Sequence, residues 1–192
     1  MSTRKPAAAV DPLFLDRWST RAFDPTPLEP DTLAALLEAA RWAPSCFNDQ
    51  PWLFMVADTP EELDRFRPLL VEGNRRWASS APVLVFVCAR KAFRHNGKPN
   101  RWAEFDAGAA WMSLALQATL RGLYTHPMAG FHEERAHEVL GLPASEYRIL
   151  AAVAIGNRGE VAALPEDIAS REVPSGRVPP DQVVKRGPAP QA

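Results

Sequence analysis

Residues 82–89, Pro-Val-Leu-Val-Phe-Val-Cys-Ala, decide the fold of this 192-residue chain. The stretch is apolar without interruption and rich in β-branched residues, which is typical of a central strand buried on both faces of a sheet. Two further runs, 53–57 and 147–155, have the same character and predict two more buried strands. Because a sheet buried on both faces needs helices to cover it, the segments around these strands should be helical.

The segments between the predicted strands carry that helical signal. A helix capped by Asp31 is expected to run to Pro44, with its apolar residues on one face: Leu33, Leu36, Leu37 and Ala40. Other helices are predicted at 13–22, at about 60–70 behind a Thr59 cap, at 104–121 and at 132–140. The alternation predicts a helix-flanked sheet. Since three strands are few, we expect a further strand from the C-terminal tail, within the chain or through a partner subunit.

The predicted helix 104–121 and the segment before it differ sharply in character. The helix is apolar nearly all round, which places it at the centre of the molecule or at a subunit interface. Residues 90–103 are basic and contain Gly97 and Pro99, and we expect them to form an exposed loop.

Length and composition narrow the class of protein. The length suits one domain: we expect a flexible arm at 1–12 and a single domain at 13–187, with a proline-rich tail at 160–187. The net charge is −1, which gives no electrostatic case for nucleic acid or an acidic membrane surface. The N-terminus lacks the apolar run of a signal peptide and no segment suits a membrane span, so a cytoplasmic protein is expected.

The cysteines and histidines suggest no special chemistry. Cys46 and Cys88 are too few for a disulfide scaffold, and Cys88 should lie in the core. The four histidines show no metal-ligand spacing, so no metal site is predicted.

Two segments carry candidate binding chemistry. Arg17-Trp-Ser-Thr-Arg21 would place both arginines on one face of a helix, where two guanidinium groups and the hydroxyl of Ser19 suit a phosphate. By itself this segment fits a solvated basic face better. Residues 43–52, Ala-Pro-Ser-Cys-Phe-Asn-Asp-Gln-Pro-Trp, form a rigid polar loop that suits a preformed ligand site or an ordinary turn.

The order of these segments resembles the FMN-dependent nitroreductase family. Arg-x-Ser-x-Arg is followed by Leu-Glu-Ala-Ala-Arg-Trp-Ala-Pro-Ser-x-x-Asn-x-Gln-Pro-Trp at residues 37–52. Four later pieces agree in order: Asn74 ahead of Ala81-Pro82, the helix start 106–110, Pro127-Met-Ala-Gly-Phe131, and Arg177-Val-Pro179 with Val183-Val184. The resemblance spans about residues 13–187.

The resemblance implies which residues bind FMN. The phosphate and ribityl chain would be held by the run from Arg17 to Arg21, namely Arg17, Trp18, Ser19 and Arg21, with Arg177 completing the phosphate site. Ser45 and Cys46 match positions that touch the flavin from the second subunit. Asn74 matches a residue at the pyrimidine edge of the flavin. Met128, Ala129 and Gly130 match a loop that passes near N5.

The resemblance also implies fold, assembly and activity. It predicts an α+β sheet sandwiched by helices, in an interlocked homodimer whose tail at 160–187 wraps the partner subunit. NADH or NADPH would reduce the bound FMN, and a small aromatic acceptor, nitroaromatic or quinone, would then be reduced by a ping-pong mechanism without a catalytic side chain. The alternatives are a specialised member of the dehalogenase or dehydrogenase type that does not use NAD(P)H directly, or an FMN-binding protein with little turnover.

Two features depart from the family pattern. Many members carry a basic residue three positions after the asparagine, where this chain has Trp77, so Arg75 or Arg76 would have to replace it. Residues 91–103 are short and basic where many relatives have a longer helical excursion over the active site. The usual substrate range of the family is therefore not assumed.

Overall fold

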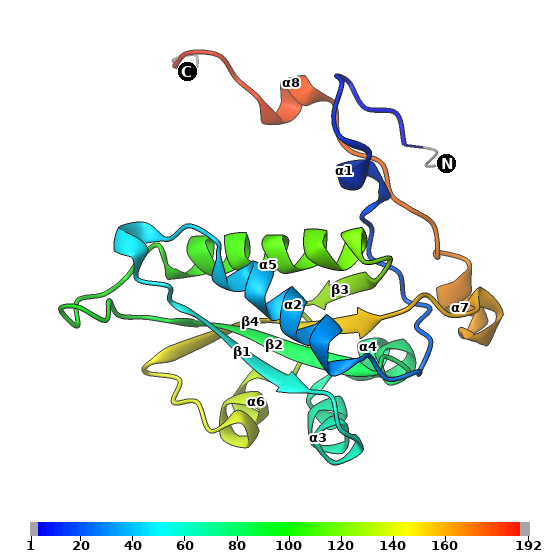
Figure 1. The fold of residues 1–192 in the computed structure, drawn as a ribbon, viewed down its shortest axis with the longest axis horizontal. Helices are drawn as coiled ribbons and strands as arrows, with labels where there is room; N and C mark the ends of the chain where they lie inside the picture. Colours follow the sequence, from blue (N-terminus) through cyan, green and yellow to red (C-terminus); the bar gives the residue numbers. More distant parts are fainter. Residues whose placement is uncertain (1–3, 189–192) are drawn as a thin grey trace.

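The computed structural model describes residues 4–188, and its framework is a four-stranded antiparallel sheet (Figure 1). The strand order is β1 (Trp52–Ala57), β2 (Val83–Arg90), β4 (Tyr147–Gly156) and β3 (Tyr124–Met128). β2 lies inside the sheet and is buried at every position except its last. This confirms residues 82–89 as a central strand.

The fourth strand is β3, which the sequence did not predict. It lies between the predicted helices 104–121 and 132–140, and it contains Pro127, which is paired with Val153 of β4. β3 forms an edge of the sheet, and an edge strand tolerates a proline because one row of its N–H groups has no ladder partner. Within the described residues the tail adds no strand to the sheet, so that prediction was wrong for the single chain.

Helices cover both faces of the sheet, as predicted (Figure 1). One face carries α2 (Pro30–Arg41) and α5 (Ala103–Leu120), and the other carries α3 (Pro60–Phe66), α4 (Glu72–Ala78) and α6 (Glu133–Leu140). The side chains of β2 alternate between two apolar clusters. Val83, Val85 and Val87 belong to the cluster of α2 and α5, whereas Leu84, Phe86 and Cys88 belong to the other. The fold is α+β, with the sheet sandwiched by helices.

The helix ends agree with local sequence signals in part. Thr59 and Glu62 form a capping box at the start of α3. The helix predicted to run to about residue 70 is interrupted because Pro68 lacks an N–H, and a short 3₁₀ turn at Arg67–Leu69 follows α3. Asp31 is not the cap of α2, which begins after Glu29. Asp31 lies in its first turn, where its charge favours the helix dipole.

α5 has two different apolar faces. The face that packs on the sheet and α2 is made of small and medium side chains, among them Ala107, Ala110 and Leu114. The opposite face leaves Phe105, Met112 and Leu120 exposed, at 76%, 36% and 67% of their surface. These three residues, spaced at seven and eight positions, are called the α5 stripe below. The helix therefore lies on the sheet with an apolar face still open.

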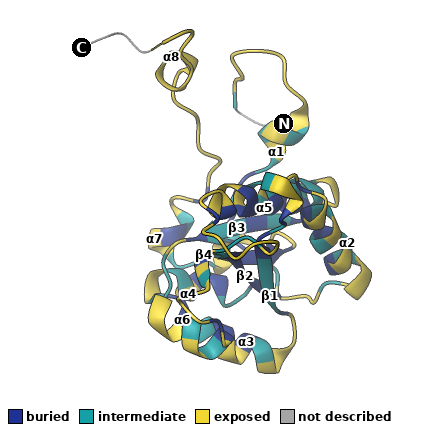
Figure 2. Ribbon diagram, turned by 90° about the vertical axis from the view of Figure 1, so that its left-hand side faces the viewer, coloured by how far each residue is buried: buried dark blue, intermediate teal, exposed yellow. Residues whose placement is uncertain are grey.

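The two ends of the chain project from the sheet together (Figures 1 and 2). The N-terminal part holds α1 (Pro12–Asp16), and the tail holds a 3₁₀ turn (Val161–Ala163), α7 (Glu166–Ala169) and α8 (Pro180–Val183). Residues 4–7 and 14–15 line one groove of about 490 Å³ together with residues 175–180 and 183–184 of the tail. Among the helices of residues 4–188, none combines the length and apolar character needed to span a bilayer.

Candidate cofactor-binding site

The segment Arg17–Arg21 is extended rather than helical. α1 ends at Asp16, and Arg17 has a ψ of 117°, which is a β-region value. The prediction of a helix over 13–22, with Arg17 and Arg21 on one helical face, was therefore wrong. The two arginines are still brought to the same region, but by an extended backbone.

A buried carboxylate from the tail explains why this segment is not helical. Glu172 has a fully buried side chain and accepts hydrogen bonds from the N–H of Arg21 at 2.9 and 3.0 Å and of Ala22 at 3.4 Å. It also accepts a bond from the Thr20 hydroxyl. Because each buried N–H needs a partner, these bonds satisfy donors that a helix would have paired with its own carbonyls. The segment from Arg17 to Ala22, held in this way, is called the anchor segment below.

Arg17 lies in a cluster of like charges. Burial lowers the pKa of Arg17, and the positive charges of Arg4 and Arg177 lower it further. Arg177 also lowers the pKa of Arg4, so the three guanidinium groups are close to one another. Neither Arg17 nor Arg177 forms an ion pair with a carboxylate anywhere in residues 4–188. The two guanidinium groups of Arg17 and Arg177 fit a phosphate, which accepts several charge-assisted hydrogen bonds.

The other residues of the anchor segment have distinct environments. Arg21 lies 4.0 Å from Glu172, so a carboxylate already balances part of its charge. Trp18 is buried beside Tyr124, with the two rings edge-on and their centroids 6.2 Å apart, and the Arg158 guanidinium lies 5.3 Å over the Trp18 ring. Ser19 is half-buried, and its hydroxyl makes no hydrogen bond within the part of the chain that is described.

Asn74 and Gly130, two of the residues that the family resemblance singled out, are in contact. The side-chain amide of Asn74 donates to the Gly130 carbonyl at 2.9 Å, and the Val71 N–H donates to the same oxygen at 3.2 Å. A Cβ on Gly130 would lie 2.7 Å from the Asn74 amide nitrogen and 2.8 Å from a methyl of Val71, so only glycine fits there. This bond uses one of the two N–H donors of Asn74 and fixes the amide, and the amide oxygen remains available to a ligand. Met128 is buried at the end of β3, and Ala129 is exposed.

Ser45 and Cys46 lie far from the anchor segment. The Cys46 N–H donates at 3.0 Å to Asp106 in the first turn of α5, whereas the anchor segment lies near the other end of that helix (Figure 1). An 18-residue helix is about 27 Å long. One chain therefore brings together Arg17, Ser19, Arg21 and Arg177, and separately Asn74 and Gly130, but it does not bring Ser45 and Cys46 to the arginines.

Comparison with known proteins identifies the family. The family model described as Nitroreductase family matches residues 15–76 and 69–157. The chain belongs to the nitroreductase family.

Three known proteins show how close the similarity is. A crystal structure described as an oxidoreductase containing FMN is 45% identical, with a TM-score of 0.92, and the match covers 98% of this chain and 96% of that one. A putative NADH dehydrogenase/NAD(P)H nitroreductase of Streptomyces coelicolor is 33% identical over 150 residues, or 67% of this chain and 73% of its own length. A nitroreductase family protein of Clostridium difficile, 22% identical with a TM-score of 0.73 over 95% of this chain and 100% of that one, shares the fold.

Trp77, where the chain departs from the nitroreductase pattern, is a packing residue of the core. Trp77 is buried, stacked on Phe23 at 6.3 Å and packed against His126 at 4.5 Å. Arg75 pairs with Glu72, and Arg76 pairs with Asp167 at 2.8 Å, and both arginines are exposed. Each neighbouring guanidinium therefore already has a carboxylate partner.

Sequence reasoning missed Glu172 and the environment of His126. His126 donates from Nδ1 to the Thr20 carbonyl at 2.8 Å, which ties β3 to the anchor segment. Burial lowers the pKa of His126. A single glutamate in a proline-rich tail gives no local signal, because its partners lie about 150 residues away. Within residues 4–188 no group of three His, Cys, Asp or Glu side chains could hold a metal ion.

Proposed function

We propose that this nitroreductase-family chain binds FMN and uses NADH or NADPH to reduce a small aromatic acceptor. The observation that carries the proposal is the unbalanced cluster of Arg17 and Arg177 beside the free hydroxyl of Ser19. A phosphate with a charge of about −1.5 to −2 suits that cluster. The relative that is 45% identical over nearly its whole length is described as containing FMN, which supports the assignment.

The residues present fit the rest of the cofactor. Ser19 would donate its hydroxyl to the phosphate or the ribityl chain. The amide oxygen of Asn74 would accept a hydrogen bond from the N–H of the pyrimidine edge, because its own N–H₂ is held by Gly130. The backbone of residues 128–130 would pass the ring, and the close approach at Gly130 keeps that loop fixed against α4.

The chain's contribution is binding and positioning. Bound FMN supplies the two-electron chemistry between NAD(P)H and the acceptor. The guanidinium groups of Arg17, Arg21 and Arg177 hold negative charge at one end of the site. No side chain needs to act as an acid, base or nucleophile, and we assign no catalytic residue.

The complete site requires a second subunit. Ser45 and Cys46 lie at the other end of α5 from the arginines, so we propose that they reach the flavin bound by a partner chain. The open α5 stripe would be covered in this homodimer, since an exposed apolar face of this length is typical of an interface. The tail at 160–187 would wrap the partner, because Val173, Val178, Val183 and Val184 are exposed on it.

Flavin reduction tests the activity. The purified protein should be yellow and release FMN on denaturation. Anaerobic stopped-flow mixing with NADH or NADPH should bleach the flavin absorbance, and 4-nitrobenzamide or a quinone should restore it. Parallel lines in a double-reciprocal plot would support the ping-pong order. A protein that gains no flavin from added FMN, or a flavin that neither nucleotide reduces, would overturn the proposal.

A further inference from the structure

Residues 90–101 form a basic hairpin between β2 and α5. A bridge between Ala92 and Pro99 closes it, and it contains five arginines and lysines, one histidine and no acidic residue. Only Arg90 of the five forms an ion pair with a carboxylate within the described chain. Lys91 donates to a backbone carbonyl, and Arg101 lies over the Trp102 ring at 4.6 Å. The hairpin therefore carries positive charge that its surroundings do not balance.

The hairpin is fixed to the loop that holds Ser45 and Cys46. Asp49 of that loop has a side chain only 1% exposed, and it accepts the Arg94 N–H at 2.7 Å and pairs with Arg90 at 3.3 Å. The Ser45 hydroxyl in turn accepts the Gln50 N–H at 3.0 Å. The hairpin and residues 45–50 are thus joined into one unit. The carboxylate of Asp49 already has Arg90 and the Arg94 N–H as partners within this unit.

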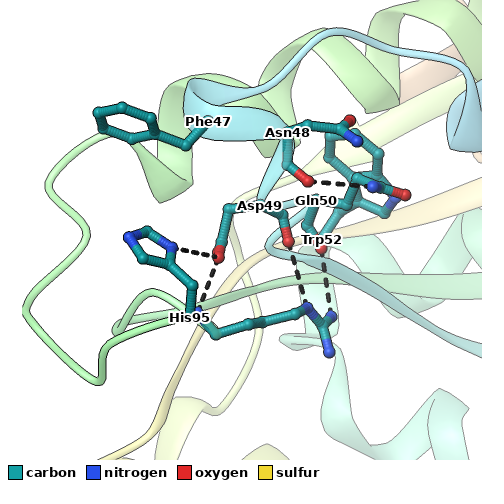
Figure 3. Close-up of a pocket in the computed structure, with 7 residues that line it drawn as sticks. Phe47, Asn48, Asp49, Gln50, Trp52 and His95 are labelled. Atoms are coloured by element: carbon teal, nitrogen blue, oxygen red, sulfur yellow. Dashed lines mark hydrogen bonds and ion pairs between the residues drawn. The ribbon is translucent and has the colours of Figure 1, made fainter.

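A pocket of about 350 Å³ opens between the hairpin and this loop (Figure 3). Arg94 lies at its wall. Its Nε donates to the Asp49 carbonyl and its Nη2 to the Gln50 carbonyl, both at 3.2 Å. These acceptors are uncharged, so they hold the guanidinium in place without neutralising it. Its remaining N–H groups have no partner in the described structure and are available to a ligand.

The rim of the pocket is aromatic. Phe47 is 81% exposed, and its ring contacts Phe93 at 5.9 Å and His95 at 5.8 Å in edge-on geometry. Phe47, Asn48 and Gln50 all have φ near +50°, a conformation that non-glycine residues rarely adopt. Such backbone persists where the surroundings hold it and is frequent at ligand sites. The pocket combines a fixed cation with an aromatic surface and has the volume of a small-molecule site.

From this geometry we infer that the pocket binds the carboxylate or phosphate group of an aromatic electron acceptor, with Arg94 as the residue that selects anionic acceptors. The inference rests on the proposed function, since residues 45–50 are those expected to face the partner's flavin. The planar guanidinium matches a carboxylate or phosphate, and the Phe47 ring offers a surface for the aromatic ring of the same molecule.

Binding without turnover provides the test. FMN-loaded protein, with no nicotinamide nucleotide present, is titrated by calorimetry with 4-nitrobenzoate, 4-nitrophenyl phosphate and the neutral 4-nitrobenzamide. We expect one or both anions to bind more tightly than the amide, and the comparison shows which anion the pocket prefers. Arg94→Gln should lower the anion-to-neutral preference about tenfold, the ratio given by one charge-assisted hydrogen bond. Arg94→Lys should retain much of the preference because it keeps the charge.

Lys98→Gln is the matched control. It removes one charge from the same hairpin but does not line the pocket, so the preference should stay unchanged. Equal loss for the anions and the amide in Arg94→Gln would show a merely structural role and overturn the inference, as would equal binding of all three probes by the wild type. Anion preference without flavin reduction would reject only the proposed function, and reduction without anion preference would reject only this inference.

Discussion

The anchor segment and the loop at residues 45–50 are both irregular, and both are held by buried carboxylates, but the carboxylates come from different places. Glu172 reaches the anchor segment from the tail, about 150 residues away in sequence. Asp49 belongs to the loop it holds, and Asp106, which is 60 residues from Cys46 in sequence, lies in the first turn of α5. The anchor segment should therefore depend on docking of the tail, whereas the loop depends on its own Asp49, on the hairpin at residues 90–101 and on the first turn of α5.

Replacing Glu172 should have the largest effect. Glu172→Ala leaves the buried Arg21 N–H without an acceptor and removes the carboxylate partner of the Ala22 N–H and the Thr20 hydroxyl, so we expect a loss of about 3 kcal/mol in the free energy of unfolding. FMN should also dissociate. Urea denaturation and flavin content measure both effects. Glu166→Ala, an exposed tail glutamate, should change stability by less than about 0.5 kcal/mol. Equal effects from the two variants would contradict the role given to Glu172.

Replacing Arg17 should affect the cofactor more than the fold. Arg17→Ala removes one charge-assisted contact to the phosphate, worth about 1.5–3 kcal/mol of FMN affinity. The effect of Arg177→Ala should not add fully to it, because the two groups share one ligand. Fluorescence titration of apoprotein with FMN gives both values, and Arg135→Ala on the exposed face of α6 is the control. Unchanged affinity in Arg17→Ala would place the phosphate elsewhere.

Replacing Asp49 tests the other half of the comparison, the loop at residues 45–50. Asp49→Asn removes the charge beside the half-buried Arg90 and weakens the bond from the Arg94 N–H, and we expect a loss of about 1–2 kcal/mol in stability. FMN content should fall less than in Glu172→Ala. Asp64→Asn breaks an ion pair in which Asp64 is highly exposed and should change little. A larger loss of stability or of FMN in Asp49→Asn than in Glu172→Ala would contradict this prediction.

The smallest expected effect is a pH dependence at His126. Burial lowers its pKa in the folded state below the usual value of about 6.5, so the unfolded chain takes up a proton first as the pH falls. Protonation then favours unfolding, and this part of the stability is present above pH 6.5 and declines below it. His126→Gln should show a shallower decline between pH 7 and pH 5 than the wild type. The exposed His132→Gln should not, and identical slopes in all three proteins would refute the effect.

The parts of the fold with local signals were predicted well. The unbroken apolar run of β2, the capping box of α3 and the long apolar α5 each depend on residues close in sequence. β3 was missed because Pro127 argues against a strand, and a proline is tolerated within a sheet only in an edge strand such as this one. The helix predicted over 13–22 was wrong because the backbone N–H groups of Arg21 and Ala22 donate to Glu172, a contact that periodicity cannot show.

The sequence predicted which residues belong to the candidate site better than it predicted how they are arranged in space. The family resemblance named Asn74 and Gly130, which the structure places in contact, and Arg17 with Arg177, which it places close together. Neither the hairpin's attachment to Asp49 nor the pairing of Arg75 and Arg76 with carboxylates has a signature in the sequence, since each depends on tertiary packing.

Because Glu172 lies in the tail, binding of FMN and docking of the tail are thermodynamically linked. If docking of the tail raises the affinity for FMN, binding of FMN must raise the stability of the docked tail by the same factor. Emptying the site should then expose the chain after about residue 160 to proteases, and refilling it should protect the same bonds. The protein would thus carry in its C-terminus a readout of whether its flavin is present.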